Sequence, residues 1–377
     1  MRLVIAGGGT GGHVGPGLAV VAALRRRVAL DLLWLGTRDG VERRLAGEQG
    51  IPFRAIQAGK LRRYFSPHTA VDAGRIPLGV LQAAAALRRF QPDVVFGTGG
   101  FVSVPAIVAA AALRVPSLIH EQTAQVGLAN RINLRFADVL ALPYEASRTN
   151  LPRTTRRVVV TGNPVRAELL AGDAGAGARR LGLDPAVPTV YVTGGARGAH
   201  AVNTAVAALL PDLLDRCQVV HACGPAEANG DCARLSAAAA GWPPASHARY
   251  AVREFIGAEL PDVYALAALV VGRAGAGTVA ELAALGKPAV LIPLPGAGGD
   301  EQTRNARLLA DAGGAVVLPE ADLTPERLRA TLADLLADPA RLAQMGVAAR
   351  ALARPDAADA LADEVLRLAG GRMTNDE

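Results

Sequence analysis

A glycine-rich stretch near the start of the chain leads into a histidine, and this combination could bind an anion and accept a proton. Residues 7–12 contain five glycines around Thr10, and His13 follows them directly. A glycine loop lets backbone N–H groups approach a phosphate, and the positive end of a helix dipole strengthens the attraction. The same dipole disfavours a protonated imidazole, so we expect His13 to be neutral and able to act as a general base. A histidine that only caps the helix is the alternative.

The elements that position this loop are a strand before it and a helix after it. Residues 2–6 are apolar and predict a buried strand, and residues 18–24 predict a helix with Pro16 near its first turn. Further apolar runs lead into glycine loops at residues 97–100, 194–199 and 272–277. This alternation predicts the α/β fold class with parallel, doubly wound sheets, whose ligands bind beyond the carboxyl ends of the strands.

Length and pattern predict two domains. The chain has 377 residues, of which 51% are hydrophobic, and this is enough for two cores. Residues 162–166, Gly-Asn-Pro-Val-Arg, predict a hinge, after which the pattern of strands and helices starts again. We therefore place one domain at residues 1–163 and a second at 164–344, facing each other across a cleft that suits two substrates. The Gly- and Ala-rich residues 172–177 are expected to be mobile.

The two halves of the chain differ in charge. Residues 1–165 carry 21 Lys and Arg against 9 Asp and Glu, a net charge of +12, whereas the remainder carries 19 against 25, a net charge of −6. A basic first half favours a phosphorylated substrate or an acidic lipid surface as its partner. Without RNP-like or zinc-finger motifs, nucleic acid is not expected, and no metal-binding motif is present. Neither a signal peptide nor a membrane-spanning run is found, which predicts a cytoplasmic protein.

The first glycine loop also matches a dinucleotide-binding pattern, as Gly7-x-Gly9-x-x-Gly12. That pattern requires an acidic residue at the end of the second strand to bind a ribose. No acid occurs there before Asp39, although Arg38 could suit a 2′-phosphate. The dinucleotide interpretation and a purely structural turn therefore stay open as alternatives. No glycine loop continues into the Gly-Lys-Ser/Thr of a nucleotide-binding P-loop.

Several polar residues of the second half could contact a nucleotide. Glu281 lies three residues after Thr278 at a predicted helix start, so the pair could form a capping box or Glu281 could bind ribose hydroxyls. Arg166 follows the hinge and could bind a phosphate. Gln302 and Asn305 lie near the carboxyl end of a predicted strand, where ordinary surface polarity is the alternative.

An ordered set of motifs resembles the MurG family of bacterial glycosyltransferases, which makes lipid II. The set spans residues 1 to about 350. It consists of GGTGGHV at 8–14 with PGLA at 16–19, GKLRR at 59–63, GTGGFVS at 97–103, HEQ at 120–122, GNPVR at 162–166, GG-x-x-GA at 194–199, EFI at 254–256, RAGAGT-x-x-E at 273–281 and Q-x-x-NA at 302–306.

The resemblance implies a GT-B fold, with a C-terminal helix at about 345–370 packing back onto the first domain. It implies an inverting, metal- and cofactor-independent transfer of N-acetylglucosamine from its UDP donor to the muramyl 4-hydroxyl of lipid I, for peptidoglycan synthesis, cell shape and cell division. The implied partners are the UDP-sugar, an undecaprenyl-pyrophosphoryl lipid, an anionic membrane surface, and cell-wall synthesis and division complexes. The implied location is peripheral, on the cytoplasmic face of the cell membrane.

The resemblance also implies roles for individual residues. His13 would be the catalytic base. The donor would be held in the second half by Arg166, Ala196, Ile256, Ala276, Gly277, Thr278, Val279, Ala280, Glu281 and Gln302. Thr10, Gly11, Gly12, Thr123 and Asn130 would face the donor sugar or the acceptor. The acceptor diphosphate would lie on Gly8, Gly9, Gly97, Thr98, Gly99 and Gly100.

The chain departs from the family pattern at Thr123, where an asparagine is usual, and at Ala196, where a serine is usual. Both positions should lie near the donor, so a related transferase with another nucleotide sugar or acceptor is one alternative. A UDP-N-acetylglucosamine 2-epimerase and a non-catalytic sugar-nucleotide sensor are two more. For membrane docking we expect the basic, aromatic stretch 60–65 and a helix at 76–90.

Overall fold

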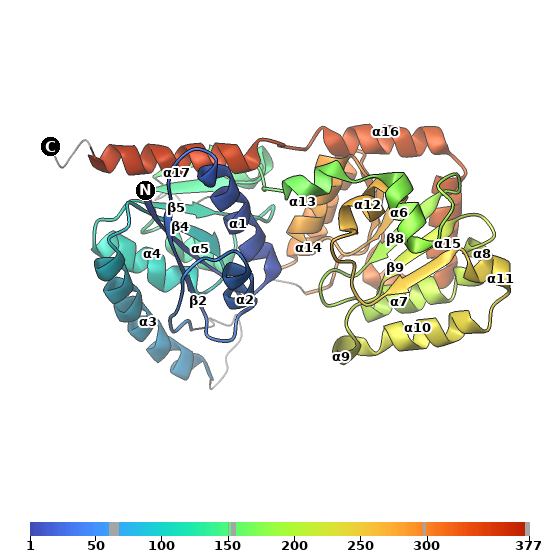
Figure 1. Cartoon of the computed structure of the whole chain (residues 1–377), viewed down its shortest axis with the longest axis horizontal. Helices are drawn as coiled ribbons and strands as arrows, with labels where there is room; N and C mark the ends of the chain where they lie inside the picture. Colours follow the sequence, from blue (N-terminus) through green and yellow to red (C-terminus); the bar gives the residue numbers. More distant parts are fainter. Residues whose placement is uncertain (60–67, 150, 152–155, 297–298, 374–377) are drawn as a thin grey trace. The chain divides into compact units, whose positions relative to one another are not determined.

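The computed structural model describes residues 1–59, 68–149, 151, 156–296 and 299–373, with only the backbone described at 68–74 and 372–373. The chain forms two compact units. Unit 1 comprises Met1–Val165 together with Arg354–Glu377, and unit 2 comprises Arg166–Ala353 (Figure 1). The predicted stretch 60–65 lies outside the described residues.

Unit 1 is built on a parallel sheet of seven strands in the order β3-β2-β1-β4-β5-β6-β7. Its strands are β1 (Arg2–Gly7), β2 (Asp31–Gly36), β3 (Phe53–Ala55), β4 (Val94–Gly99), β5 (Ser117–His120), β6 (Val139–Leu142) and β7 (Arg157–Val160). Its helices are α1 (Gly11–Arg25), α2 (Val41–Glu48), α3 (His68–Phe90), α4 (Ser103–Ala112), α5 (Leu128–Asn133) and α17 (Ala357–Met373), with a 3₁₀ turn at Glu145–Arg148.

Helices cover both faces of this sheet, so its central strands are mostly apolar and buried, as parallel strands covered on both faces require. On one face Leu3, Trp34 and Phe96 pack with α1 and with Leu361 and Val365 of α17. On the other face the strands pack against α3, α4 and α5 (Figure 1).

Unit 2 repeats the arrangement with six parallel strands in the order β10-β9-β8-β11-β12-β13. Its strands are β8 (Thr189–Thr193), β9 (Gln218–Ala222), β10 (Tyr250–Arg253), β11 (Ala267–Gly272), β12 (Ala289–Leu291) and β13 (Ala315–Val317). Its helices are α6 (Ala174–Leu181), α7 (His200–Ala207), α8 (Leu210–Leu213), α9 (Ala226–Asn229), α10 (Asp231–Ala240), α11 (Pro244–His247), α12 (Leu260–Leu266), α13 (Ala276–Leu285), α14 (Glu301–Asp311), α15 (Pro325–Leu336) and α16 (Pro339–Arg350). Two 3₁₀ turns lie at Ala167–Ala171 and Glu320–Asp322.

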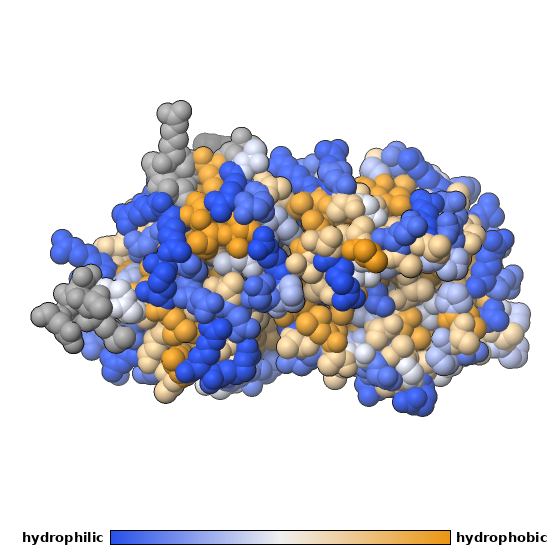
Figure 2. Space-filling view, turned by 90° about the horizontal axis from the view of Figure 1, so that it is seen from above, coloured by the Kyte–Doolittle hydropathy of each residue, from blue (hydrophilic) through white to orange (hydrophobic). Residues whose placement is uncertain are grey.

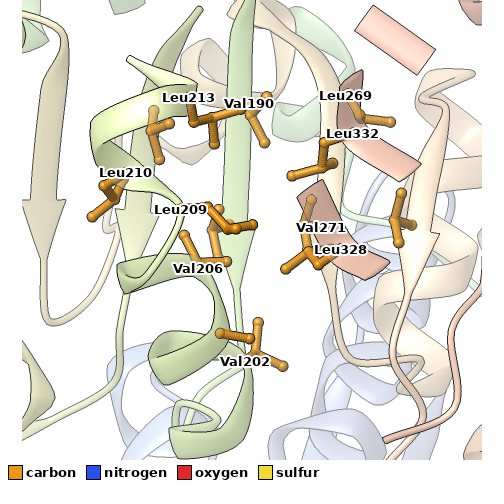
Figure 3. Packing of buried hydrophobic residues seen from close by; sticks show 14 of the residues in the cluster. Val190, Val202, Val206, Leu209, Leu210, Leu213, Leu269, Val271, Leu328 and Leu332 are labelled. Atoms are coloured by element: carbon orange, nitrogen blue, oxygen red, sulfur yellow. The ribbon is translucent and has the colours of Figure 1, made fainter. Parts of the chain in front are cut away.

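The core of unit 2 joins its central strands to the helices around them. Val190 of β8 and Val271 of β11 pack with apolar residues of α7, α8 and α15, among them Val206, Leu210 and Leu332 (Figure 3). The predicted α/β fold with two doubly wound parallel sheets is confirmed in both units.

Three local expectations were wrong. The first helix begins at Gly11, seven residues earlier than predicted, so His13 and Pro16 lie inside it. Residues 172–177 are not a mobile stretch, because α6 starts at Ala174, where the Asp173 carboxylate accepts the N–H of Ala176 at 2.5 Å. The expected C-terminal helix does pack onto unit 1, but its start at about 345 was wrong, because α16 ends at Arg350 in unit 2 and α17 begins at Ala357.

The surface mixes polar and apolar residues. On the face shown in Figure 2, hydrophobic residues occur in small groups among hydrophilic ones. Within the described parts of the chain, none of the helices has the length and apolar character needed to cross a bilayer.

Candidate active site

In unit 1, two glycine loops meet where the strand order reverses. Chain segments after β1 and β4 leave neighbouring strands at the centre of the sheet, which is the usual ligand position of such sheets. Gly99 (φ +98°) and Gly100 (φ +76°) have left-handed backbones. A Cβ on Gly99 would lie 2.8 Å from Nδ1 of His13, and a Cβ on Gly100 would overlap the carbonyl of Gly8. The structure thus brings the two predicted loops and His13 together.

His13 is the third residue of α1 and is half-buried. Its Nδ1 lies 2.9 Å from Oε1 of Gln122. Among the described residues, Nε2 of His13 has no hydrogen-bond partner. Gly11 and Gly12 are exposed and open α1, so their backbone N–H groups are the ones that an anion could reach.

A buried carboxylate fills the inner side of the first glycine loop. Glu42 of α2 accepts the N–H of Gly9 at 3.0 Å through Oε2, and the N–H and hydroxyl of Thr37 at 2.8 and 2.7 Å through Oε1. A Cβ on Gly8 or Gly40 would overlap this carboxylate. The N–H of Gly9 is therefore already bound, and a negative charge lies where a dinucleotide would need hydrogen-bond donors, which argues against the dinucleotide interpretation.

The second loop is shorter than predicted. Gly97 and Thr98 lie inside β4, and both residues are buried. Gly97 is packed between Ile107 and Ile119. Only Gly99 and Gly100 reach the end of the strand, and Gly97 and Thr98 support the loop from beneath rather than lining it.

Thr123 and Asn130 are both turned toward the buried carboxylate of Glu121. Oε1 of Glu121 accepts the hydroxyl of Thr123 at 2.8 Å, and Oε2 accepts the side-chain amide of Asn130 at 3.0 Å and the N–H of Gly127 at 2.9 Å. Asn130 is 3% exposed, and the Thr123 hydroxyl also lies 2.6 Å from the carbonyl of Gln125. These hydrogen bonds hold the loop after β5 in shape. The side chains of Thr123 and Asn130 therefore bind other groups of the protein and do not point freely toward a sugar.

The corresponding point in unit 2 lies between β8 and β11. Ala196 is exposed in the loop after β8, and Gly194 lies so close to Ala199 that a Cβ would overlap it. After β11, Arg273 pairs with Glu320 and donates to the carbonyl of Ile292 at 3.1 Å. The loop that carries Ala196 thus stands at the carboxyl edge of the sheet, at the usual ligand position of such folds.

Glu281 has a partner other than the predicted one. Because α13 begins at Ala276, Thr278 lies within the helix and the capping box with Glu281 does not form. Instead, the hydroxyl of Tyr264 donates to Oε2 of Glu281 at 2.9 Å. Burial raises the pKa of Glu281, while the Tyr264 hydroxyl and the charge of Arg166 lower it. Arg166, Tyr264 and Glu281 therefore form one electrostatic group.

The remaining predicted donor residues lie along the same unit. Ala276, Gly277 and Thr278 form the first turn of α13, with Val279 and Ala280 buried behind them. Ile256 is buried, and Oε1 of Gln302 accepts the N–H of Leu294 at 3.0 Å. Asn305 donates its side-chain amide to the carbonyl of Ala274 at 3.2 Å, which ties α14 to the loop before α13.

Sequence reasoning missed the roles of Glu42, Glu121, Gln122 and Tyr264. Glu42 gave no signal, since a carboxylate on an amphipathic helix is usually solvated. Glu121 and Gln122 belong to a recognised motif, but their spacing did not indicate that their side chains bind the backbone. Only the structure shows that three glycines, Gly8, Gly36 and Gly40, crowd around the side chain of Glu42.

Comparison with known proteins identifies the family. Residues 3–141 match the glycosyltransferase family 28 N-terminal domain, and residues 189–361 match the glycosyltransferase family 28 C-terminal domain. The UDP-N-acetylglucosamine--N-acetylmuramyl-(pentapeptide) pyrophosphoryl-undecaprenol N-acetylglucosamine transferase of Halalkalibacterium halodurans is 37% identical, over 96% of this chain and 98% of the relative. The crystal structure of Acinetobacter baumannii MurG is 31% identical with a TM-score of 0.74, over 97% of this chain and 99% of that chain. The chain belongs to the MurG family.

Membership in the MurG family confirms the GT-B fold and identifies the chain as a glycosyltransferase. A UDP-GlcNAc 2-epimerase from Neisseria meningitidis has a TM-score of 0.67 at 13% identity, over 97% of this chain and 100% of that chain. At this identity the similarity reflects the shared fold alone. The sequence identity therefore does not support the epimerase alternative. It supports membership in the MurG family over nearly the whole chain.

Proposed function

We propose that this glycosyltransferase moves N-acetylglucosamine from UDP-N-acetylglucosamine to the muramyl 4-hydroxyl of lipid I, giving lipid II for peptidoglycan synthesis. One observation carries the proposal: the 37% identity to a transferase named for this reaction extends over 96% of the chain. The reversal point of the first sheet, with His13 on α1, supplies a matching site for the acceptor.

Unit 1 binds the acceptor in this proposal. The N–H groups of Gly11 and Gly12 face the lipid diphosphate, helped by the dipole of α1. Nε2 of His13 takes the proton of the 4-hydroxyl while that oxygen attacks the anomeric carbon. The bond from this carbon to the UDP oxygen breaks at the same time, UDP leaves with the electron pair, and the configuration is inverted.

Unit 2 binds the donor. Oε1 of Glu281 has no partner among the described residues, while Tyr264 holds Oε2, so the free oxygen is suited to accept a ribose hydroxyl. Arg166 and the first turn of α13 supply positive charge and N–H groups for the diphosphate. We propose that these groups replace a divalent ion. Transfer that continues unchanged in excess EDTA would agree with this, and recovery by added Mg²⁺ would contradict it.

Membrane binding is proposed through α3. Leu78 and Leu81 are 48% and 68% exposed, although apolar side chains of this size usually pack inward. On the same helix, Arg75 lies three residues before Leu78 and Arg88 lies seven residues after Leu81, and both arginines are exposed. This pattern suits a peripheral helix on the anionic cytoplasmic face of the cell membrane. Binding to anionic vesicles should weaken with added salt and with Leu81→Glu.

The function is tested with the purified full chain, UDP-N-acetylglucosamine and a lipid I analogue, by measuring UDP release and the disaccharide product. We expect UDP release only when the acceptor is present. Conversion of the donor without acceptor would indicate an epimerase, and binding without turnover a sensor. His13→Ala should reduce kcat about 10²–10⁴-fold, as expected for the loss of a general base. A panel of other UDP-sugars tests whether Thr123 and Ala196 alter donor choice.

A further inference from the structure

A buried chain of hydrogen bonds connects His13 to the end of β5. It runs from Nδ1 of His13 through the side chains of Gln122 and His120 to the carbonyl of Gly162. We propose that Gln122, held by His120 and Thr98, is a positioning residue that keeps the imidazole proton of His13 on Nδ1. This leaves the lone pair of Nε2 for the acceptor hydroxyl. The inference deepens the proposed function, because it rests on His13 being the base.

The orientation of the Gln122 amide follows from its neighbours. Nε2 lies 2.8 Å from the carbonyl oxygen of Thr98 and 3.1 Å from that of His120. Carbonyl oxygens only accept hydrogen bonds, so the end of the amide that faces them must be the NH₂ group. Rotating the amide by 180° would place oxygen against two oxygens. Oε1 therefore points toward His13, and Gln122 itself is 2% exposed, which leaves little room for another arrangement.

This orientation determines the tautomer of His13. The amide oxygen of Gln122 can only accept, and it lies 2.9 Å from Nδ1 of His13, so Nδ1 must carry a hydrogen. A neutral imidazole has one N–H hydrogen, and Nε2 is then an acceptor. Gly99 confines the ring as well, because there is no space for a Cβ between it and Nδ1. The ring is thus fixed both in its orientation and in its tautomer.

His120 supports the arrangement from behind. Its Nε2 lies 3.0 Å from the carbonyl of Gly162 and must be the N–H donor, so its Nδ1 accepts from Nε2 of Gln122 at 3.1 Å. Burial lowers the pKa of His120 to about 4, and the charge of nearby Glu121 acts in the opposite direction. His120 is therefore neutral at physiological pH, and its Nδ1 remains an acceptor. The NH₂ group of Gln122 has two hydrogens and three acceptors around it, the carbonyls of Thr98 and His120 and Nδ1 of His120, which keeps it turned away from His13.

The chemical consequence follows from the behaviour of free histidine. A neutral imidazole in water prefers the tautomer with its hydrogen on Nε2, which has no lone pair available at that atom. Without the acceptor supplied by Gln122, most His13 side chains would hold the hydrogen on the nitrogen that must act as the base. Proteins commonly fix the tautomer of a histidine through a hydrogen bond to the ring nitrogen that does not take part in the reaction.

The test compares the wild-type full chain with Gln122→Met, which keeps the length but removes the acceptor, and with Gln122→Glu, which retains it. The ¹⁵N chemical shifts of the His13 imidazole, assigned with His13→Ala, report the tautomer without any need for activity. We expect a hydrogen on Nδ1 in the wild type and on Nε2 in Gln122→Met. We further expect kcat to fall roughly 10–100-fold in Gln122→Met, as for other outer-shell partners, with an unchanged KM for the donor.

Gln122→Glu separates positioning from a general loss of structure. In its protonated form the carboxyl group can accept from Nδ1 through one oxygen and donate to the Thr98 carbonyl through the other, so we expect the wild-type tautomer and a kcat above that of Gln122→Met. In the His13→Ala background, Gln122→Met should cost nothing further.

Two results would overturn the inference: a hydrogen on Nε2 of His13 in the wild type, or a folded Gln122→Met with unchanged tautomer and kcat. Failure of the proposed function would look different. If His13→Ala kept the wild-type rate, or if lipid I analogues were not substrates, the ¹⁵N shifts would still report whether Gln122 sets the tautomer.

Discussion

The carboxylate of Glu42 accepts a hydrogen bond from the backbone N–H of Gly9 at 3.0 Å, although Gly9 belongs to a loop that is suited to bind anions. One N–H of that loop thus serves the protein itself. The loop is held to α2 before any ligand arrives, and under the proposed function the N–H groups of Gly11 and Gly12 at the start of α1 would face the acceptor. Preorganisation of this kind lowers the cost of ordering the loop upon binding.

Glu42→Gln should weaken both the fold and acceptor binding. Three donors face the carboxylate, and an amide must turn its NH₂ group toward at least one of them. We expect a loss of about 2–4 kcal/mol in the free energy of unfolding and a raised KM for the acceptor, with the KM for the donor unchanged. Urea denaturation and steady-state kinetics measure the two effects. Glu48→Gln, on the exposed side of the same helix, is the matched control and should stay within about 0.5 kcal/mol.

Gly99→Ala should disturb His13 directly. The new Cβ would lie 2.8 Å from Nδ1 of His13, at a residue with φ +98°. A displacement of the His13 imidazole by up to about 1 Å should reduce kcat about 10²-fold. Gly50→Ala is the control, because Gly50 has φ +65° with open space around it. It should lose stability through backbone strain alone and keep its kcat, and equal kcat values in the two variants would contradict this prediction.

Glu281→Gln should affect recognition of the donor ribose. We expect a rise of about tenfold in the KM for UDP-N-acetylglucosamine with little change in kcat, which corresponds to the loss of one charge-assisted hydrogen bond. The variant should also discriminate less between the donor and its 2′-deoxyuridine analogue. Tyr264→Phe, which removes only the hydroxyl that holds Oε2, should show a smaller rise. An unchanged preference for the ribonucleotide in Glu281→Gln would count against a ribose contact.

Ala196→Ser restores the hydroxyl that is usual in the MurG family. Ala196 is exposed in the loop after β8, so the substitution fits without repacking. If the donor diphosphate lies against this loop, one added hydrogen bond should tighten donor binding about 3–10-fold, as measured by calorimetry with UDP. Ala228→Ser, on the exposed side of the short helix α9, should leave the affinity unchanged. Equal affinities of Ala196→Ser and wild type would place the diphosphate elsewhere.

Two buried histidines should make the protein sensitive to acid. Burial lowers the pKa of His120 in unit 1 and of His221 in unit 2 to about 4 in each case, below the ordinary value of 6.5. The unfolded chain therefore binds protons near pH 6.5 while the folded chain does not, so stability is complete above that pH and falls as the pH drops toward 4. The expected loss at pH 5 is about 2 kcal/mol for each histidine.

Urea denaturation at pH 7.5 and pH 5 tests this prediction, because Trp34 reports on unit 1 and Trp242 on unit 2. His221→Gln should flatten the pH dependence of the Trp242 signal and leave that of Trp34 in place. His247→Gln, which changes an exposed histidine of unit 2, should alter neither signal.

The strands were predictable and the polar interior was not. Apolar runs such as residues 2–6 and 267–271 identify buried parallel strands because little else tolerates such sequences. By contrast, the position of Glu42 depends on a loop, a strand and a helix that meet only in the folded chain. By contrast, the short helix α6 is rich in glycine and alanine, and its ends are set by residues next to it, Asp173 at one end and Gly182 (φ +70°) at the other. Local sequence patterns could have indicated the ends of α6, but they carry no information on the distant partner of Glu42, the N–H of Gly9.

The last helix of unit 1 has a consequence for synthesis of the protein. Leu361 and Val365 of α17 complete the core around Leu3 and Trp34, yet all of Arg166–Ala353 precedes them in the chain. At about 5–20 residues per second, a ribosome needs roughly 10 to 40 seconds to make that intervening unit. During this time one face of the first sheet is covered by α1 but lacks α17, and the nascent chain exposes apolar surface of the kind that chaperones bind.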